Sequence, residues 1–295
     1  MHRLFFALVG ALVLAACGPA APGSVTDDLG RTVALGGTPE SVMSLAPNIT
    51  ELVATAAGVD RLAGVGMSDD FPAGVAQRPR VQTLPLDLEG IVALAPSLAI
   101  GSDDVNTADT ADGLEALGIP AYLFRFDEVA DVPRALRTLD TLLAVSGGAP
   151  AAADFERRVA AVQDAVSPFS SPRVLLLVGS ETLYAFGRDS YASELVRLAG
   201  GDNLTDAFEG ASSVPSDEVV LEMAPEVIIV LSGPDFDPAS LLRDHPTFFN
   251  LPAIVNGRVY GMDPDLVSRP GPRLVEGLER LARLLHPEAF AAGAA

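Results

Sequence analysis

The sequence predicts an α/β protein of two lobes with mostly parallel sheets, joined by a single long helix. Strand and helix signals alternate along the chain, a long helical stretch lies at its middle, and one segment of the first half recurs in the second. A chain of 295 residues that is 49% hydrophobic can bury one large or two medium cores. We therefore divide the chain after residue 24 into an N-terminal lobe (25–148), a linking helix (149–167) and a C-terminal lobe (168–295).

Short strand and helix signals alternate through the first half. The apolar stretch "SVMSLAP" (41–47) predicts a strand that ends in a turn, and Asn48 with Glu51 forms a capping-box pattern at the start of a helix. Alternation continues with expected strands at "RLAGVG", "SLAIG" and "IPAYLFR", and expected helices at "LEGIVALAP", "TADGLEALG" and about 131–145. Short loops between such elements favour a parallel sheet covered on both faces.

The pattern restarts after a long helical segment. Residues 149–166 have apolar positions at helical spacing, and Pro150 lies in the first turn, where proline is tolerated. Strands are then expected at "RVLLLV", "EVIIVL" and "GRVYGM", and helices at "YASELVRLAG", "DEVVLEMAP" and "GPRLVEGLERLARLLHP". The chain therefore has the order lobe, helix, lobe.

An internal repeat supports this division. "LEGIVALAPSLAI" from Leu88 and "DEVVLEMAPEVII" from Asp217 share an acid, an apolar helical turn, an Ala-Pro stop and an apolar strand at the same spacing. Glu89 corresponds to Glu218, and each lies near a helix N-terminus, where the helix dipole favours negative charge. On spacing alone, these acids are either first-turn stabilisers or equivalent contacts, one on each lobe, for a basic partner.

The charge balance limits the partners. Acidic residues number 39 against 19 basic ones, every basic residue is an arginine, and the formal net charge is -20. Such a surface repels phosphate backbones, so nucleic acid is not an expected partner.

The N-terminus predicts export. Arg3, the apolar run 4–14 and the small pair Ala15-Ala16 have the pattern of a signal peptide over residues 1–16, which is too short to span a membrane as a stable helix. Cys17 is the only cysteine and opens a flexible tether over 17–24. No second thiol remains after processing, which excludes zinc sites built from several cysteines.

Residues 14–17 (Leu-Ala-Ala-Cys) resemble the lipobox of bacterial lipoproteins. In that motif the cysteine is lipidated and becomes the new N-terminus. The resemblance implies an exported protein, anchored to a membrane through Cys17 on its periplasmic or cell-surface side.

Five blocks resemble, in order, the helical-backbone solute-binding proteins of ABC importers, which deliver cobalamin, ferric siderophores or haem. These blocks are "VTDDLGRTV", "SLAPNITELV", "LEGIVALAPSL", "DEVVLEMAPEVIIV" and "NGRVYGMDPDLVSRPGPRLVEGLERLARLLHP". The resemblance implies two Rossmann-like lobes on one rigid helix, a ligand in the cleft between them, and modest closure on binding. It also implies a monomer that delivers its ligand to a membrane permease and ATPase, with Glu89 and Glu218 engaging permease arginines.

Ligand contacts are expected in loops that follow strands. The positions carried over are Pro47, Asn48, Phe71, Leu84, Ser102, Tyr184, Phe186, Arg188, Ser212 and Arg269. Cobalamin-binding members place tryptophans at several of these, whereas this chain has none, and Leu84, Ser102 and Ser212 stand roughly where those rings would stack. Arg188 and Arg269 are the candidates for an anionic ferric siderophore. The sequence therefore favours two ligand classes almost equally, cobalamin or another corrinoid and a ferric siderophore.

Haem binding, direct metal-ion binding and enzymatic activity have less support from the residues present. Haem-binding members use a tyrosine ahead of the first repeated acid, and "VQTLPLDLE" has none; direct capture of a metal ion needs several histidines, and only His245 and His286 remain after processing. A hydrolytic α/β enzyme is the remote alternative, because no G-x-S-x-G, Walker A or G-x-G-x-x-G motif follows a strand. We expect no catalytic residue, no bound metal site and no resident cofactor other than the ligand chelate.

Overall fold

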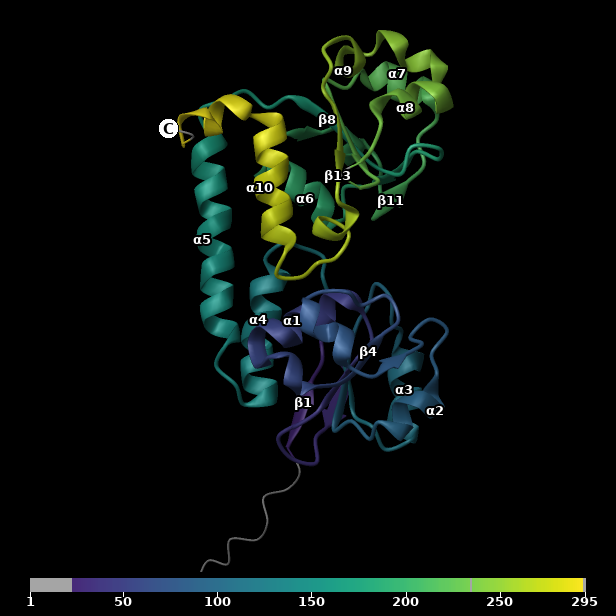
Figure 1. The fold of residues 1–295 in the computed structure, drawn as a ribbon, viewed down its shortest axis with the longest axis vertical. Coiled ribbons are helices and arrows are strands. Elements are labelled where there is room, and N and C mark those ends of the chain that lie inside the picture. The colour runs from purple at the N-terminus through teal and green to yellow at the C-terminus, as the bar shows by residue number, and fades with distance from the viewer. Residues whose placement is uncertain (1–22, 234, 294–295) are drawn as a thin grey trace, which may run out of the picture.

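The computed structural model describes residues 23–233 and 235–293 and shows two α/β lobes with a long helix beside them (Figure 1). The predicted α/β class with two Rossmann-like lobes is confirmed. Cys17 and the predicted signal peptide lie outside the described residues. Within these ranges no helix has the length and apolarity needed to cross a membrane.

The N-terminal lobe has a five-stranded parallel sheet in the order β5-β4-β3-β6-β7. Its strands are β3 (Val42–Ser44), β4 (Leu62–Gly66), β5 (Arg80–Val81), β6 (Leu98–Ser102) and β7 (Ala121–Phe124). A hairpin of β1 (Ser24–Thr26) and β2 (Thr32–Ala34) precedes it. The strand order reverses between β3 and β6, and ligands of such sheets bind outside the carboxyl ends at this switch point.

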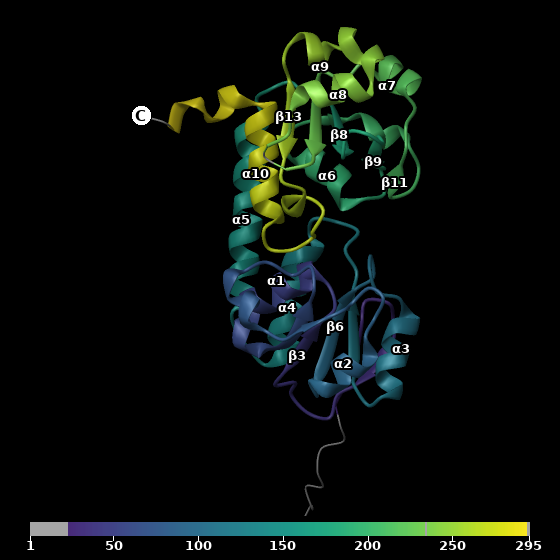
Figure 2. The same ribbon diagram turned by 45° about the vertical axis from the view of Figure 1, so that its right-hand side comes forward.

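The C-terminal lobe has a mixed sheet in the order β11-β9-β8-β12-β13, with β10 also paired to β8. Its strands are β8 (Arg173–Val178), β9 (Tyr184–Phe186), β10 (Asp202–Asn203), β11 (Ser212–Ser213), β12 (Val227–Leu231) and β13 (Val259–Met262). β8, β10, β12 and β13 pair in parallel, while β9 is antiparallel to both β8 and β11. The antiparallel edge brings the short β9 and β11 segments toward the other lobe (Figure 2).

Helices cover both sheets. In the N-terminal lobe these are α1 (Pro47–Ala57), α2 (Leu88–Ala93), α3 (Ala108–Ala116) and α4 (Asp131–Leu143). In the C-terminal lobe they are α6 (Tyr191–Leu198), α7 (Asp217–Met223), α8 (Pro238–Asp244), α9 (Pro252–Val255) and α10 (Leu274–Leu285). Short 3-10 helices are η1 (Val59–Arg61), η2 (Ala73–Gln77), η3 (Leu204–Ala207), η4 (Pro246–Asn250), η5 (Pro264–Leu266) and η6 (Pro287–Gly293).

The long helix α5 (Gly148–Val166) connects the lobes over about 28 Å. Its buried Phe155 and Val162 belong to a hydrophobic cluster that continues into both lobes. Two ion pairs fasten the middle of α5 to its neighbours, from Arg137 on α4 to Glu156 (2.6 Å) and from Arg158 to Glu279 on α10 (2.8 Å). Because α5 packs against both lobes, it is a rigid connection.

The repeated segments fold alike. An alanine in the left-handed region follows each helix, Ala95 after α2 and its C-cap Leu94, and Ala224 directly after α7, both with φ of 45°. Each alanine is followed by a proline, Pro96 or Pro225, and each segment then continues into a parallel strand, β6 in the first half and β12 in the second. The turn that ends the helix is therefore the same in both halves.

The capping box predicted at Asn48 and Glu51 is wrong. Ala46 is the N-cap of α1, and no side chain caps this helix. Asn48 instead donates from Nδ2 to the Pro270 carbonyl at 3.4 Å, and Glu51 binds Arg273. Both side chains bond to residues near the C-terminal end of the chain, and the spacing of neighbouring residues in the sequence cannot predict such contacts.

Candidate functional site

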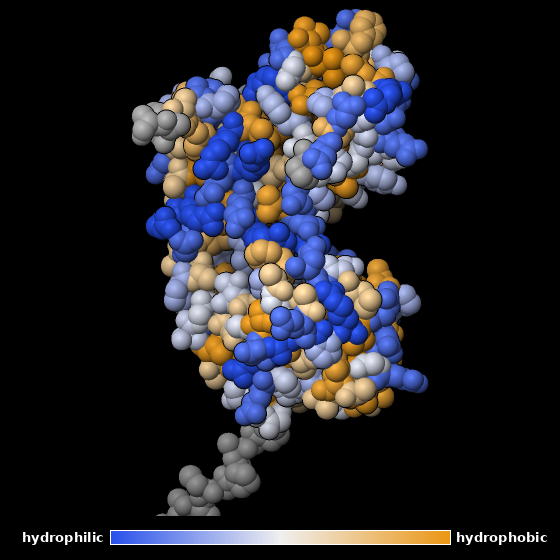
Figure 3. Space-filling model, viewed as in Figure 1, coloured by the Kyte–Doolittle hydropathy of each residue, from blue (hydrophilic) through white to orange (hydrophobic). Residues whose placement is uncertain are grey.

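A cleft with a volume of about 320 Å³ lies between the two lobes. Its N-terminal wall is formed by Asp104, which follows β6, and by Phe126 and Asp127, which follow β7. Its C-terminal wall is formed by Phe186, Asp189, Ser190, Tyr191, Ala211, Ser212 and Ser268. The surface is visibly hollowed between the lobes (Figure 3). The N-terminal wall thus comes from the carboxyl ends of parallel strands, where the sheet order predicts a ligand.

A second cavity of about 620 Å³ adjoins this cleft and shares Asp127, Asp189 and Ser190 with it. Arg188, Arg197, Glu128 and Glu194 also line it. Glu194 on α6 accepts a hydrogen bond of 2.7 Å from the Val129 backbone N–H, which connects the lobes behind the cleft. The two cavities together give room for a ligand larger than either one alone.

The cleft combines aromatic walls with carboxylates. Phe186 is half-buried and offers aromatic surface to the cleft, whereas Phe126 and Tyr191 line it with only 3% and 7% of their surface exposed. Asp104 retains access to the solvent of the cleft, yet burial of its carboxylate, with the charges of Asp103 and Asp127, raises its pKa to about 6. The cleft therefore has an apolar lining with a negative rim.

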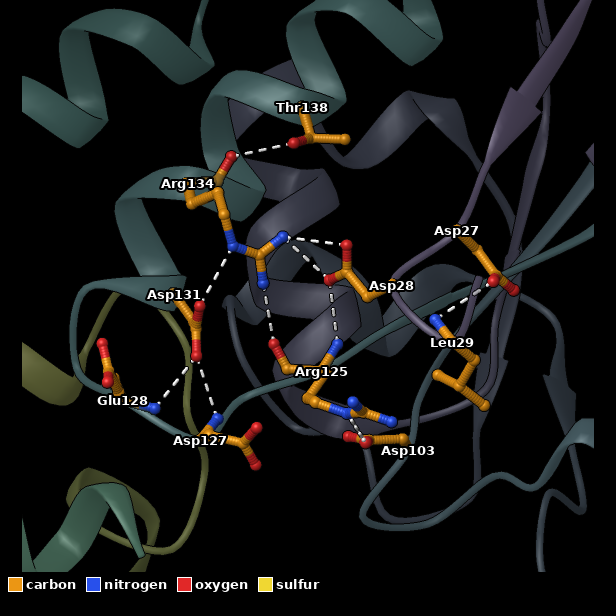
Figure 4. Close-up of polar contacts among 10 residues, drawn as sticks. All are labelled: Asp27, Asp28, Leu29, Asp103, Arg125, Asp127, Glu128, Asp131, Arg134 and Thr138. Carbon is orange, nitrogen blue, oxygen red and sulfur yellow. Dashed lines mark hydrogen bonds and ion pairs between the residues drawn. The ribbon is translucent and has the colours of Figure 1, made fainter. Parts of the chain in front are cut away.

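A network in the N-terminal lobe holds the segment that carries Asp127 (Figure 4). Arg134 on α4 binds Asp28 at 2.8 Å and Asp131 at 3.0 Å. Asp131 in turn accepts the backbone N–H groups of Asp127 and Glu128, both at 2.9 Å. The side chain of Asp127 takes no part in this network, so the network positions it without neutralising it.

An ion cluster closes one side of the gap between the lobes. Arg273 binds the buried carboxylate of Glu51 through two hydrogen bonds, at 2.7 and 3.0 Å. Arg269 binds Asp70 at 2.6 Å and Asp265 at 3.0 Å, and it lies 4.0 Å from Glu51. Burial raises the pKa of Glu51, against the opposing effect of the Arg273 hydrogen bonds. The cluster joins α1 and the 70 loop to the C-terminal lobe.

The structure brings only some predicted ligand residues together. Phe186 and Ser212 line the cleft, and Arg188 lines the adjoining cavity, where it lies 3.9 Å from Glu209. Arg269 is engaged by the acids of the ion cluster, so its guanidinium is not free for an anionic ligand. The Phe71 ring packs under the Arg273 guanidinium at 4.2 Å and belongs to the same cluster.

The other predicted ligand positions lie outside the two cavities. Pro47 is half-buried in the first turn of α1, and Asn48 is buried there. Ser102 is 1% exposed, and its N–H donates to Asn106. Leu84 and Tyr184 are 70% and 53% exposed, and neither is among the residues that line the cavities. Ser102 therefore does not occupy a stacking position.

Glu89 and Glu218 lie exposed in the first turns of α2 and α7. Figures 1 and 2 place these helices on the side of their lobes away from α5. A hydrogen bond from Ser216 lowers the pKa of Glu218, so this carboxylate is ionised at neutral pH. Neither acid forms an ion pair with any residue in the described part of the chain.

Both histidines within the described residues have structural partners. His245 contacts Asp217 at 2.7 Å and the Ser180 carbonyl at 2.9 Å, and His286 is buried at the end of α10 against the Gly200 carbonyl. Over residues 23–233 and 235–293, no three His, Cys, Asp or Glu side chains group together as a set of metal ligands.

Sequence reasoning missed Asp104, Asp127, Asp189 and Tyr191 as cleft residues. A usable signal existed for the first two, since both are acids that directly follow buried strands, in "SLAIGSDD" and "YLFRFDE". Asp189 and Tyr191 follow the short β9, whose three residues carry too little periodicity to be recognised.

The sequence of residues 42–266 matches the periplasmic binding protein family. An uncharacterised ABC transporter substrate-binding lipoprotein of Bacillus subtilis, YvrC, is 24% identical, with 96% of each chain covered. A cobalamin-binding protein of Halobacterium salinarum is 26% identical over 90% of this chain and 74% of its own. A vitamin B12-binding protein of Vibrio parahaemolyticus is 25% identical over 81% and 86%.

Solved structures have the same fold. A periplasmic heme-binding protein from Pseudomonas aeruginosa superposes with a TM-score of 0.75 at 25% identity, covering 84% of this chain and 93% of its own. The periplasmic vitamin B12-binding protein of Vibrio cholerae gives 0.73 at 24% identity, covering 86% and 98%. With the sequence match over most of its length and a cleft between two lobes on one helix, this chain belongs to the periplasmic binding protein family.

Proposed function

We propose that this protein is the extracytoplasmic substrate-binding component of an ABC importer, which captures a metal-containing chelate between its lobes and delivers it to the permease. One observation carries the proposal: a cleft at the carboxyl edge of a parallel sheet, with walls from both lobes and aromatic side chains on each wall. The relatives named above are binding proteins, which supports binding rather than catalysis.

The proposed ligand is a corrinoid or a ferric siderophore. The names of the Halobacterium and Vibrio relatives favour a corrinoid. Phe186, beside the largely buried Phe126 and Tyr191, offers apolar surface in place of the absent indole rings. The protein needs no resident cofactor for this function, because the ligand itself carries the metal.

Haem is the second candidate, favoured by the likeness to the Pseudomonas heme-binding structure. A tyrosinate is one of the ligands by which proteins hold haem iron. Tyr191 is the cleft tyrosine, and burial, with the charge of Asp104, raises its pKa far above the usual range. A neutral phenol is a poor ligand for ferric iron, and haem propionates would face the carboxylates of the cleft, so haem ranks below the other two.

We further propose that the protein is a monomer anchored through lipidated Cys17, and that Glu89 and Glu218 contact arginines of the permease. The B. subtilis relative is named a lipoprotein, which supports the anchor. The exposed, unpaired state of both acids within the described residues supports the docking role.

Thermal unfolding of the protein with cyanocobalamin, haemin and a panel of ferric siderophores tests the binding function. A ligand at 100 times its Kd adds about 2.7 kcal/mol to stability, which raises the Tm by roughly 5–10 °C for a chain of this size. Ala211→Trp, which fills the cleft, should abolish the shift, whereas Ala239→Trp on exposed α8 should keep it. No shift with any chelate, or a full shift with Ala211→Trp, would contradict the proposal.

A further inference from the structure

Three separate segments each contribute one aspartate to the lining of the cleft. Asp104 follows β6, Asp127 follows β7, and Asp189 precedes α6 in the other lobe, and all three line the same cavity. None of them forms an ion pair within residues 23–233 and 235–293. Asp189 accepts one hydrogen bond of 2.9 Å, from the backbone N–H of Gly210.

The arginines nearest to the cleft are already paired. Arg125 binds Asp103 at 2.9 Å, Arg197 binds Asp206 at 2.6 Å, and Arg269 binds Asp70. Arg188 opens onto the adjoining cavity, beside Glu209. The lining of the cleft of about 320 Å³ contains acids and no arginine, while Arg188 and Arg197 line the adjoining cavity.

On the N-terminal wall, neighbouring acids repel the carboxylate of Asp104. The raised pKa of Asp104, near 6, has its largest cause in burial, followed by repulsion from Asp103 and Asp127. Asp104 is faced by Asp103, Asp127 and the buried Tyr191, with the Arg125 guanidinium held by Asp103. The Ser102 hydroxyl opposes the rise in the pKa of Asp104. A ligand that brings hydrogen-bond donors or positive charge relieves this repulsion, and a ligand with carboxylates adds to it.

We propose that Asp104, Asp127 and Asp189 make the cleft selective for metal chelates whose periphery carries amide or ammonium donors, and that they reject chelates with free carboxylates. The selectivity rests on the proposed binding function and specifies its substrate class. Carboxylates accept hydrogen bonds from both kinds of donor, and the charged pair is the stronger one. The apolar walls then contact the body of the chelate, while the carboxylates accept hydrogen bonds from the donors at its periphery.

Two matched ligand pairs test the selectivity by isothermal titration of the purified protein at pH 7.5. Cyanocobalamin is compared with its monocarboxylic acid, in which one peripheral amide is a carboxylate. Ferrioxamine B, which carries a protonated amine, is compared with its N-acetyl derivative. In whichever class binds, the amide or ammonium form should bind about tenfold tighter than its partner.

Variants assign the effect to residues. Asp104→Asn, Asp127→Asn and Asp189→Asn should each reduce the ratio of affinities within a pair, and the triple variant should bring it near one. Asp164→Asn, on the exposed face of α5 and outside the lining of both cavities, should leave the ratio unchanged. Should the ferrioxamine pair bind, its ratio should also fall between pH 7.5 and pH 5, as Asp104 takes up its proton, and Asp104→Asn should weaken that dependence.

The possible outcomes distinguish failure of the proposed selectivity from failure of the proposed binding function. Binding of the carboxylate form as tightly as its amide partner would overturn the selectivity while leaving the binding function intact. An unchanged ratio in the triple variant would also overturn it. Failure of every chelate to bind would instead contradict the proposed function.

Discussion

Glu51 is 2% exposed and receives two hydrogen bonds from Arg273, a residue 222 positions later in the chain. A buried ion pair contributes little beyond an apolar pair of the same shape, but the loss of one partner leaves an uncompensated charge. Glu51 and Arg273 therefore constrain each other, and through them α1 and the C-terminal lobe.

Replacing Arg273 with alanine should destabilise the fold by about 3–5 kcal/mol at pH 7.5, measured by urea unfolding. Burial raises the pKa of Glu51, so the folded protein keeps this proton to higher pH than the unfolded chain does. Ionisation of Glu51 therefore costs stability as the pH rises above its ordinary range, and the effect of Arg273→Ala should be smaller at pH 4.

Arg283→Ala is the matched control for this change. Arg283 lies exposed on α10, the helix that Arg273 precedes as N-cap, with its guanidinium over the Phe290 ring at 5.4 Å, and its loss should cost no more than about 1 kcal/mol. Equal losses for the two variants would contradict the role given to Glu51.

At the scale of elements, the start of α5 depends on one side chain. The carboxylate of Asp140, on α4, accepts the backbone N–H groups of Gly148 and Ala149, both at 2.7 Å. These N–H groups have no partner within the helix, so Asp140 acts as a cap supplied by a neighbouring helix. The junction between the N-terminal lobe and the linking helix is fixed by this contact.

Asp140→Ala should lower the free energy of unfolding by about 1 kcal/mol, the usual cost of losing an N-terminal cap. Denaturant unfolding measures the difference. Asp154→Ala, on the exposed face of α5, removes only a surface pair with Arg157 and should have a smaller effect. A larger loss for Asp154→Ala would show that Asp140 does not cap the helix.

The elements with clear periodicity could be predicted from the sequence, and the short ones could not. The expected linking helix, the buried strands and the repeat with its Ala-Pro stops all correspond to observed elements. The β1–β2 hairpin and strands β9, β10 and β11 have two or three residues each, too few for any pattern. Phe186 lies on β9 and Ser212 on β11. The sequence predicts both residues in loops, because these two strands are too short to be recognised.

The candidate site shows the same division. Its position could be predicted, because parallel strands in alternating order place a ligand at their carboxyl ends. Its charge could be predicted only in part: Asp104 and Asp127 follow the neighbouring strands β6 and β7, whereas Asp189 comes from the other lobe and lines the same cleft only when the lobes face each other. The prediction that Arg269 contacts the ligand was made without Asp70 and Asp265, which bind its guanidinium in the folded chain.

At the scale of the whole molecule, one hydrophobic cluster runs through both lobes and α5. Such continuity favours a nearly fixed arrangement of the lobes, with a preformed cleft and a preformed docking surface. Delivery would then depend on exposed groups such as Glu89 and Glu218 rather than on a large closure.

Charge reversal of Glu89 and Glu218 to arginine should reduce uptake of the labelled ligand by cells to background. The Kd in solution should stay within about twofold, because both acids lie outside the cleft. Glu222→Arg, on exposed α7 beyond its first turn, is the control and should transport normally. Normal uptake by the double variant would contradict the docking role.

The most direct test of the central claim is hydrogen exchange of the protein with and without the chelate that raises its Tm most. A ligand held between the lobes should slow exchange in both walls at once, over residues 126–129 of the N-terminal lobe and 186–191 and 211–212 of the C-terminal lobe. The linking helix should change little. Protection confined to one lobe, or found only away from these segments, would contradict binding in the cleft.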